Sequence, residues 1–202
     1  MDAVWQLQTV TPFRRATVYA LIGLLASTGL RIGEALALNV DDVKLSTDPP
    51  HLLVSNSKFG NSRNVALHST VVGQLRKYLA QRSKVLAGRH VKGLFMNRYG
   101  RHLNYNAQRL MFLRLLNLAD IHAVPGERGP SLHSFRHSFA VRRLTLWHRE
   151  RRDVQELLPH LAVYLGHVGP ENTYWYLTGT PELLHTASTR FESQPIKGGS
   201  NR

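Results

Sequence analysis

Five short patterns in this sequence combine arginine, lysine, histidine and tyrosine, whose side chains suit chemistry at a phosphate group. In chain order they are TGLRIGE (28–34), SKFGNSR (57–63), LHSFRHSFA (132–140), LGH (165–167) and ENTYWYLT (171–178). Guanidinium groups bind pairs of oxyanion oxygens. A phenol becomes a nucleophile when cationic neighbours help it to lose its proton. The patterns therefore indicate chemistry at a phosphodiester.

Taken together and in this order, the patterns resemble the tyrosine recombinase family, which includes phage integrases and the resolvases of plasmids and transposons. The resemblance runs from about Arg15 to Leu184. A single HxxR is weak, because it occurs by chance in many basic proteins, whereas five patterns in order are specific. The resemblance implies a site-specific recombinase or integrase of a mobile element. Such an enzyme cleaves and rejoins DNA through a 3′-phosphotyrosyl intermediate and uses no metal or other cofactor.

The resemblance also implies a role for each of six catalytic residues. Two arginines hold the non-bridging phosphate oxygens, and the lysine of the hairpin loop protonates the leaving 5′ oxygen. The histidine of HxxR takes the tyrosine proton or hydrogen-bonds the phosphate, the LGH histidine donates a hydrogen bond, and the tyrosine attacks phosphorus. The matching positions are Arg31, Lys58, His133, Arg136, His167 and Tyr176.

Tyr174 is the rival nucleophile, because it stands two residues before Tyr176 in the same pattern. A helix turns by about 200° over two residues, so both side chains cannot point into one site. Aromatic residues also pack more often than they react. The spacing typical of the family selects Tyr176.

A metal site is the competing interpretation of the histidine-rich segment. His133 and His137 are spaced i, i+4 on one expected helix, which is a metal-ligand spacing. However, the chain has no cysteine and no HExxH pattern, and Arg136 beside the pair would repel a cation. His137 is better explained as a packed or hydrogen-bonded helix residue. A GxxxxGK phosphate loop is also absent from the sequence, which argues against an NTPase.

The balance of charge predicts a polyanionic partner. The chain of 202 residues has 26 Lys+Arg against 13 Asp+Glu, a formal net charge of +13. We expect double-stranded DNA as this partner, with self-association into a tetramer on DNA and no membrane contact. The longest apolar stretch, Val18 to Ala26, is too short to span a bilayer. A chain without cysteine is compatible with a reducing cytoplasm, where we expect it to associate with the bacterial nucleoid.

Apolar spacing and turn residues predict a mainly α (α+β) fold in which helices flank a small three-stranded antiparallel sheet. Thr11 and Asn104 are expected helix caps, and Asn56 to Ser62 is an expected hairpin loop. The expected helices cover 13–26, 30–38, 69–87, 104–118, 132–150, 154–165, 171–177 and 181–191, and the expected strands cover 40–45, 51–55 and 63–67.

We expect a catalytic domain over residues 1–191 and a mobile tail over 192–202, which is polar and rich in glycine. Most members of the family add an N-terminal domain that clamps the opposite face of the DNA. Because Arg31 stands near the start of this sequence, the clamp domain is expected to be absent, and DNA binding by the chain alone to be weak. Residues 181–191 could dock on a neighbouring protomer or fold back on their own domain.

Two alternatives to full recombination remain open from sequence. One is a relaxing activity like that of type IB topoisomerases, which use the same phosphotyrosyl chemistry. The other is a truncated, catalytically weak or inert fragment that binds DNA without forming a covalent adduct.

Overall fold

The structure is a computed structural model that describes residues 2–7, 11–55, 62–126 and 129–166. It divides into two compact units, Met1–Phe139 and Ala140–Arg202. The helix α5 starts in the first unit and continues into the second. The expected helices at 171–177 and 181–191 and the expected tail at 192–202 lie outside the described residues, so these expectations stay predictions.

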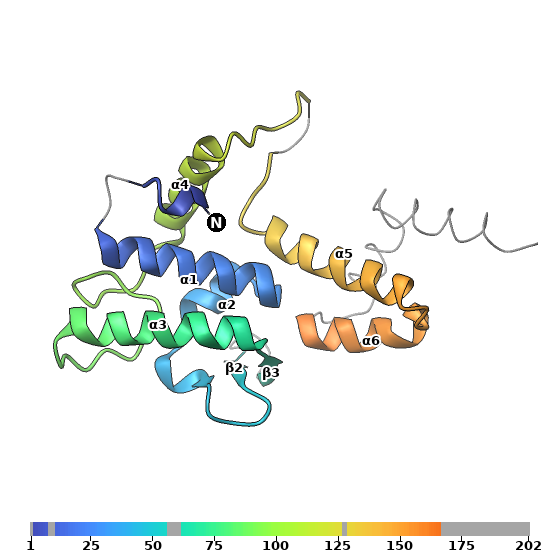
Figure 1. Cartoon of the computed structure of the whole chain (residues 1–202), viewed down its shortest axis with the longest axis horizontal. Helices are drawn as coiled ribbons and strands as arrows, with labels where there is room; N and C mark the ends of the chain where they lie inside the picture. The colour runs from blue at the N-terminus through green and yellow to red at the C-terminus, as the bar shows by residue number, and fades with distance from the viewer. Residues whose placement is uncertain (1, 8–10, 56–61, 127–128, 167–202) are drawn as a thin grey trace, which may run out of the picture. The chain divides into compact units, whose positions relative to one another are not determined.

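The described residues form a mainly helical fold with one small antiparallel sheet (Figure 1), which confirms the expected fold class. The helical elements are η1 (Asp2–Val4), α1 (Pro12–Thr28), α2 (Ile32–Ala37), η2 (Val40–Asp42), α3 (Ser69–Leu86), α4 (Tyr105–Leu118), α5 (Ser134–Arg149) and α6 (Val154–Leu165), and the strands are β1 (Val43–Lys44), β2 (His51–Ser55) and β3 (Ser62–Ala66).

Polar side chains cap the helices where the sequence predicts. Thr11 Oγ1 accepts a hydrogen bond from the Arg14 amide at 3.3 Å, and Pro12 occupies the first turn of α1. Asn104 Oδ1 accepts from the Asn106 amide at 2.8 Å, which fixes the start of α4. In the second unit, Asp153 caps α6 in the same way. These caps supply acceptors to amides that have no partner within the helix.

The sheet has the order β1-β2-β3 with both pairs antiparallel. Leu52, Val54 and Val65 are buried, so one face of the β2–β3 hairpin packs on the core. The predicted strand at 40–45 is too long, because its first half forms η2. There Asp42 turns back, and its Oδ2 accepts a hydrogen bond from the Asn39 amide at 2.8 Å.

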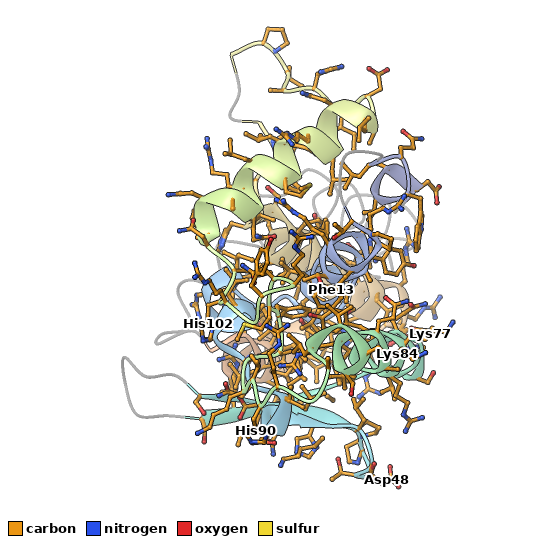
Figure 2. All side chains as sticks on the ribbon, turned by 90° about the vertical axis from the view of Figure 1, so that its left-hand side faces the viewer. Phe13, Asp48, Lys77, Lys84, His90 and His102 are labelled. Atoms are coloured by element: carbon orange, nitrogen blue, oxygen red, sulfur yellow. The ribbon has the colours of Figure 1, made fainter. Side chains whose placement is uncertain are left out.

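The core of the first unit lies around α1, which packs against α3, α2 and η1 (Figure 1). One cluster joins the start of the chain to α1 and α4 through Val4, Leu7, Val18, Ile22, Met111 and Leu115. Phe13 of α1 lies in the interior (Figure 2) and stacks on Tyr78 of α3, with 6.1 Å between the ring centroids. Burial of these apolar side chains fixes α1, and therefore its C-terminal end, in place.

Among the described residues, no helix has both the length and the hydropathy that crossing a membrane requires.

Candidate active site

The turn between α1 and α2 places Arg31 at the surface of the first unit. Gly29 ends α1 with a left-handed φ of 65°, and its amide donates to the Leu25 carbonyl at 3.0 Å. Leu30 is buried and fixes the next position. Arg31 follows as the N-cap residue of α2, and its side chain is 40% exposed. A buried leucine and a glycine-dependent turn thus hold the base of an accessible guanidinium.

Glu34 lies one turn into α2 and binds back to Arg31. Its Oε2 accepts from the Arg31 amide at 2.8 Å, and its Oε1 accepts from Arg31 Nη1 at 3.2 Å. A carboxylate three residues after the N-cap residue typically satisfies that residue's amide. Here the same carboxylate also contacts the Arg31 guanidinium.

Arg63 of β3 makes a two-pronged ion pair with Glu34. Its Nη1 and Nη2 donate to the two carboxylate oxygens, each at 3.0 Å. Both side chains are only 12% exposed, which limits screening by water. Burial alone would raise the pKa of Glu34, but the hydrogen bonds and charges of Arg63 and Arg31 outweigh it and lower this pKa below its ordinary value. Glu34 is therefore an anion at neutral pH.

Arg136 of α5 is fully buried and touches the turn that presents Arg31. Its Nη1 donates to the Gly29 carbonyl at 3.0 Å, a contact between residues 107 positions apart in the sequence. Burying a charge is costly unless hydrogen bonds compensate it. The contact connects the HxxR pattern to the TGLR pattern through the backbone.

His133 immediately precedes α5 and keeps part of its side chain exposed. Partial burial is the largest cause that lowers the pKa of His133, and the charges of Arg136 and Arg31 lower it further. His133 is therefore mainly neutral at pH 7, so it can accept a proton or donate a hydrogen bond.

The structure thus gathers three of the six predicted site residues, Arg31, His133 and Arg136, in the first unit. The other three, Lys58, His167 and Tyr176, lie outside the described residues, and their roles stay predictions.

Glu34 and Arg63 belong to the site although the sequence analysis gave them no role. The signal for Glu34 was its position three residues after Arg31, which is the spacing of a capping box. Arg63 gave no comparable signal, because its partner lies 29 positions away in the sequence.

The arrangement is suited to an anion. Arg136 of α5 donates to the turn that presents Arg31, and the charges of both arginines act on the His133 imidazole. Within the described ranges, no group of three histidine, aspartate or glutamate side chains lies close enough to hold a metal ion.

Comparison with known proteins finds recombinases among both the related sequences and the solved structures. The chain is 38% identical over 177 residues to y4rB, an integrase/recombinase of Sinorhizobium fredii, covering 87% of this chain and 56% of the relative. It is 33% identical over 144 residues to the tyrosine recombinase XerD of Corynebacterium glutamicum, covering 71% of this chain and 44% of the relative. The chain therefore spans about half the length of these relatives.

The fold is similar to the crystal structure of the XerH site-specific recombinase bound to a palindromic difH substrate in a post-cleavage complex. The TM-score is 0.72 at 23% identity, and the match covers 95% of this chain and 50% of XerH. Residues 7–181 match the phage integrase family, a range that includes all six predicted site residues. With a match over most of its length, the chain belongs to the phage integrase family.

Proposed function

We propose that this chain carries the catalytic centre of a site-specific DNA recombinase that cleaves and rejoins strands through a 3′-phosphotyrosyl intermediate. The observation that carries the proposal is the hydrogen bond from Arg136 to the Gly29 carbonyl. It brings the arginine of HxxR against the turn that presents Arg31, as a site with two arginines on one phosphate requires. Family membership supports the same chemistry.

In the proposed cleavage step, Tyr176 Oη attacks the scissile phosphorus and the bond from phosphorus to the 5′ oxygen breaks. The phenol proton passes to His133, which is mainly neutral at pH 7. Lys58 gives a proton to the leaving 5′ oxygen, so the products are a 3′-phosphotyrosyl link and a 5′ hydroxyl. The phosphodiester energy is kept in the link, and attack by the 5′ hydroxyl of another strand rejoins DNA without ATP.

Arg31, Arg136 and His167 act on the non-bridging oxygens in this proposal. Charge on these oxygens changes as phosphorus becomes five-coordinate, and fixed donors stabilise that state. Loss of one such donor typically costs roughly 10²–10³ in rate. The contacts of Arg136 with Gly29 and of Arg31 with Glu34 fix two of these donors before substrate arrives.

The proposed partner is double-stranded DNA, on which four protomers assemble for strand exchange. The net charge of +13 supports a polyanionic partner. The structure of XerH with its difH substrate supports a DNA site in a protein of this fold. We place the protein in the bacterial cytoplasm, associated with the nucleoid.

Covalent trapping tests the nucleophile. The chain would be incubated with a pool of randomised, nicked duplexes, and adducts that survive SDS would be collected and sequenced. We expect an adduct with the parent and with Tyr174→Phe, the matched control, and none with Tyr176→Phe. An amount of adduct from Tyr176→Phe equal to that from the parent would show that Tyr176 is not the nucleophile. Absence of any adduct from the parent would favour an inert DNA-binding fragment.

Recombination is separated from simple relaxation by the products formed on the trapped sequence. A plasmid carrying two copies of that sequence should yield recombinant joints if the proposal holds. Relaxed circles without joints would instead indicate an activity like that of type IB topoisomerases.

A further inference from the structure

Glu34 is shared between two guanidinium groups, and Arg63 makes the more extensive side-chain contact. Each carboxylate oxygen accepts one hydrogen bond from Arg63 and one from Arg31, the latter through its amide or its side chain. The ion pair with Arg63 is the shorter of the two side-chain contacts, at 3.0 Å against 3.2 Å for Arg31. It is also the two-pronged one, which is the stronger geometry for guanidinium and carboxylate.

The charges of these three residues bear directly on the phosphate. A carboxylate next to a phosphate-binding arginine opposes binding, because it repels the anion and competes for the guanidinium. Arg63 supplies a positive charge that balances Glu34. Glu34, Arg31 and Arg63 together then carry one net positive charge.

The exposed fractions of the three side chains agree with the pairing of Arg63 with Glu34. Glu34 and Arg63 are both 12% exposed, whereas the Arg31 side chain is 40% exposed. The buried pair is therefore the inner one, and Arg31 is the member that a ligand can reach from solvent.

We infer that Arg63 is a positioning residue that balances the charge of Glu34 and thereby limits how strongly Glu34 holds the Arg31 guanidinium, so that a phosphate group can compete for it. The inference rests on the proposed function, because it takes phosphate to be the anion that Arg31 binds. Glu34 already contacts Arg31 at 3.2 Å, and without Arg63 its uncompensated charge would hold the Arg31 guanidinium more strongly. Arg63 thus acts on the substrate only through Glu34 and Arg31.

A double-mutant comparison tests the charge balance without requiring catalysis. Inorganic phosphate is the probe, and its binding is followed by NMR through the imidazole signal of His133, on which the charges of Arg31 and Arg136 act. We expect Arg63→Gln to weaken phosphate binding roughly tenfold, because the uncompensated Glu34 then competes with phosphate for the Arg31 guanidinium. We expect Glu34→Gln combined with Arg63→Gln to restore most of the binding, since the opposing charge is gone.

Two further variants control for net charge and for folding. Lys77→Gln removes one positive charge from the exposed side of α3, where Figure 2 shows Lys77 at the edge of the unit, and should leave phosphate binding unchanged. Arg63→Lys keeps the charge but loses the fork, so it should bind phosphate nearly as well as the parent. It also serves if Arg63→Gln does not fold.

Three results would overturn the inference. They are unchanged phosphate binding in Arg63→Gln, a double variant as weak as the single one, and no phosphate binding by the parent. A merely structural role for Arg63 predicts the second result, because two substitutions should not repair packing. The proposed function fails separately, when the parent binds phosphate but forms no covalent DNA adduct.

Discussion

At the scale of single residues, the site pairs a buried cation with an exposed one. Arg136 is fully buried and donates to a backbone carbonyl, so its position is set before any ligand binds. Arg31 is partly exposed and takes its position from Glu34. Donors that are fixed in advance avoid the cost of reorganisation during the reaction. The accessible arginine therefore suits capture of an anion, and the buried one holds the turn that presents it.

His133 gives a prediction for pH. Its pKa is lowered in the folded chain, by partial burial first and by Arg136 and Arg31 next, so the unfolded chain binds its proton more readily. The contribution of His133 to the free energy of unfolding is therefore constant above its ordinary pKa of about 6.5 and declines as pH falls through the folded value. We expect His133→Gln to lose less stability than the parent between pH 8 and pH 5, as measured by urea unfolding.

His90→Gln is the matched control, because it removes an imidazole that is exposed at the surface (Figure 2). If His133→Gln and the parent lose equal stability on acidification, the arginines do not act on His133 as described.

At the scale of elements, the turn after α1 carries the site. Gly29 has a φ of 65°, where an L-residue with a Cβ is strained. We expect Gly29→Ala to lower the free energy of unfolding by about 1–2 kcal/mol. Because the Gly29 carbonyl accepts from Arg136, the same change should also slow formation of the covalent adduct. Denaturant unfolding and adduct trapping measure the two effects.

Gly33→Ala is the control for this substitution. Gly33 lies inside α2 without a positive φ, and a Cβ there would meet no atom within 4 Å. The substitution should therefore be neutral or stabilise the chain by up to about 1 kcal/mol. A loss of stability in both variants would mean that the conformation of Gly29 is not the cause.

Local signals predicted the elements well. Caps at Thr11 and Asn104 marked the starts of α1 and α4, and β2 and α6 have the predicted bounds. The predicted strand at 40–45 was wrong in its first half, because the side chain of Asp42 competes for backbone hydrogen bonds there. Residues 88–102 belong to none of the predicted helices or strands, yet Leu94 and Phe95 in this connection are buried.

Only those site residues that belong to a local sequence pattern could be predicted from the sequence. Resemblance to a family selected Arg31, His133 and Arg136, but no pattern showed that Arg136 would rest on Gly29. The pairing of Arg63 with Glu34 was missed for the same reason, because it joins a strand to a helix distant in sequence. Periodicity describes which face of an element is buried and says nothing about which elements meet.

At the scale of the whole molecule, the chain has more basic residues than the described part of the site engages. The chain has 26 Lys+Arg, of which Arg31, Arg63 and Arg136 are engaged in the described part of the site. Arg82 is buried and donates to backbone carbonyls, whereas exposed basic residues near the site would contact DNA phosphates under the proposed function. Contacts of this kind supply affinity through release of counterions and carry no sequence information.

The salt dependence of DNA binding distinguishes a phosphate contact made by Arg31 from attraction by the net positive charge of the chain. The logarithm of the binding constant should fall linearly with the logarithm of salt concentration, with a slope near −0.9 for each phosphate contacted. Arg31→Gln should reduce the magnitude of this slope by roughly one contact, because the proposed function places its guanidinium on a phosphate. Lys77→Gln and Lys84→Gln remove the same charge from the exposed side of α3 (Figure 2) and should leave the slope unchanged. Fluorescence anisotropy of a labelled duplex at several salt concentrations measures it. A shift of equal size in all three variants would mean that DNA responds to net charge alone, and that Arg31 has no privileged contact with a phosphate.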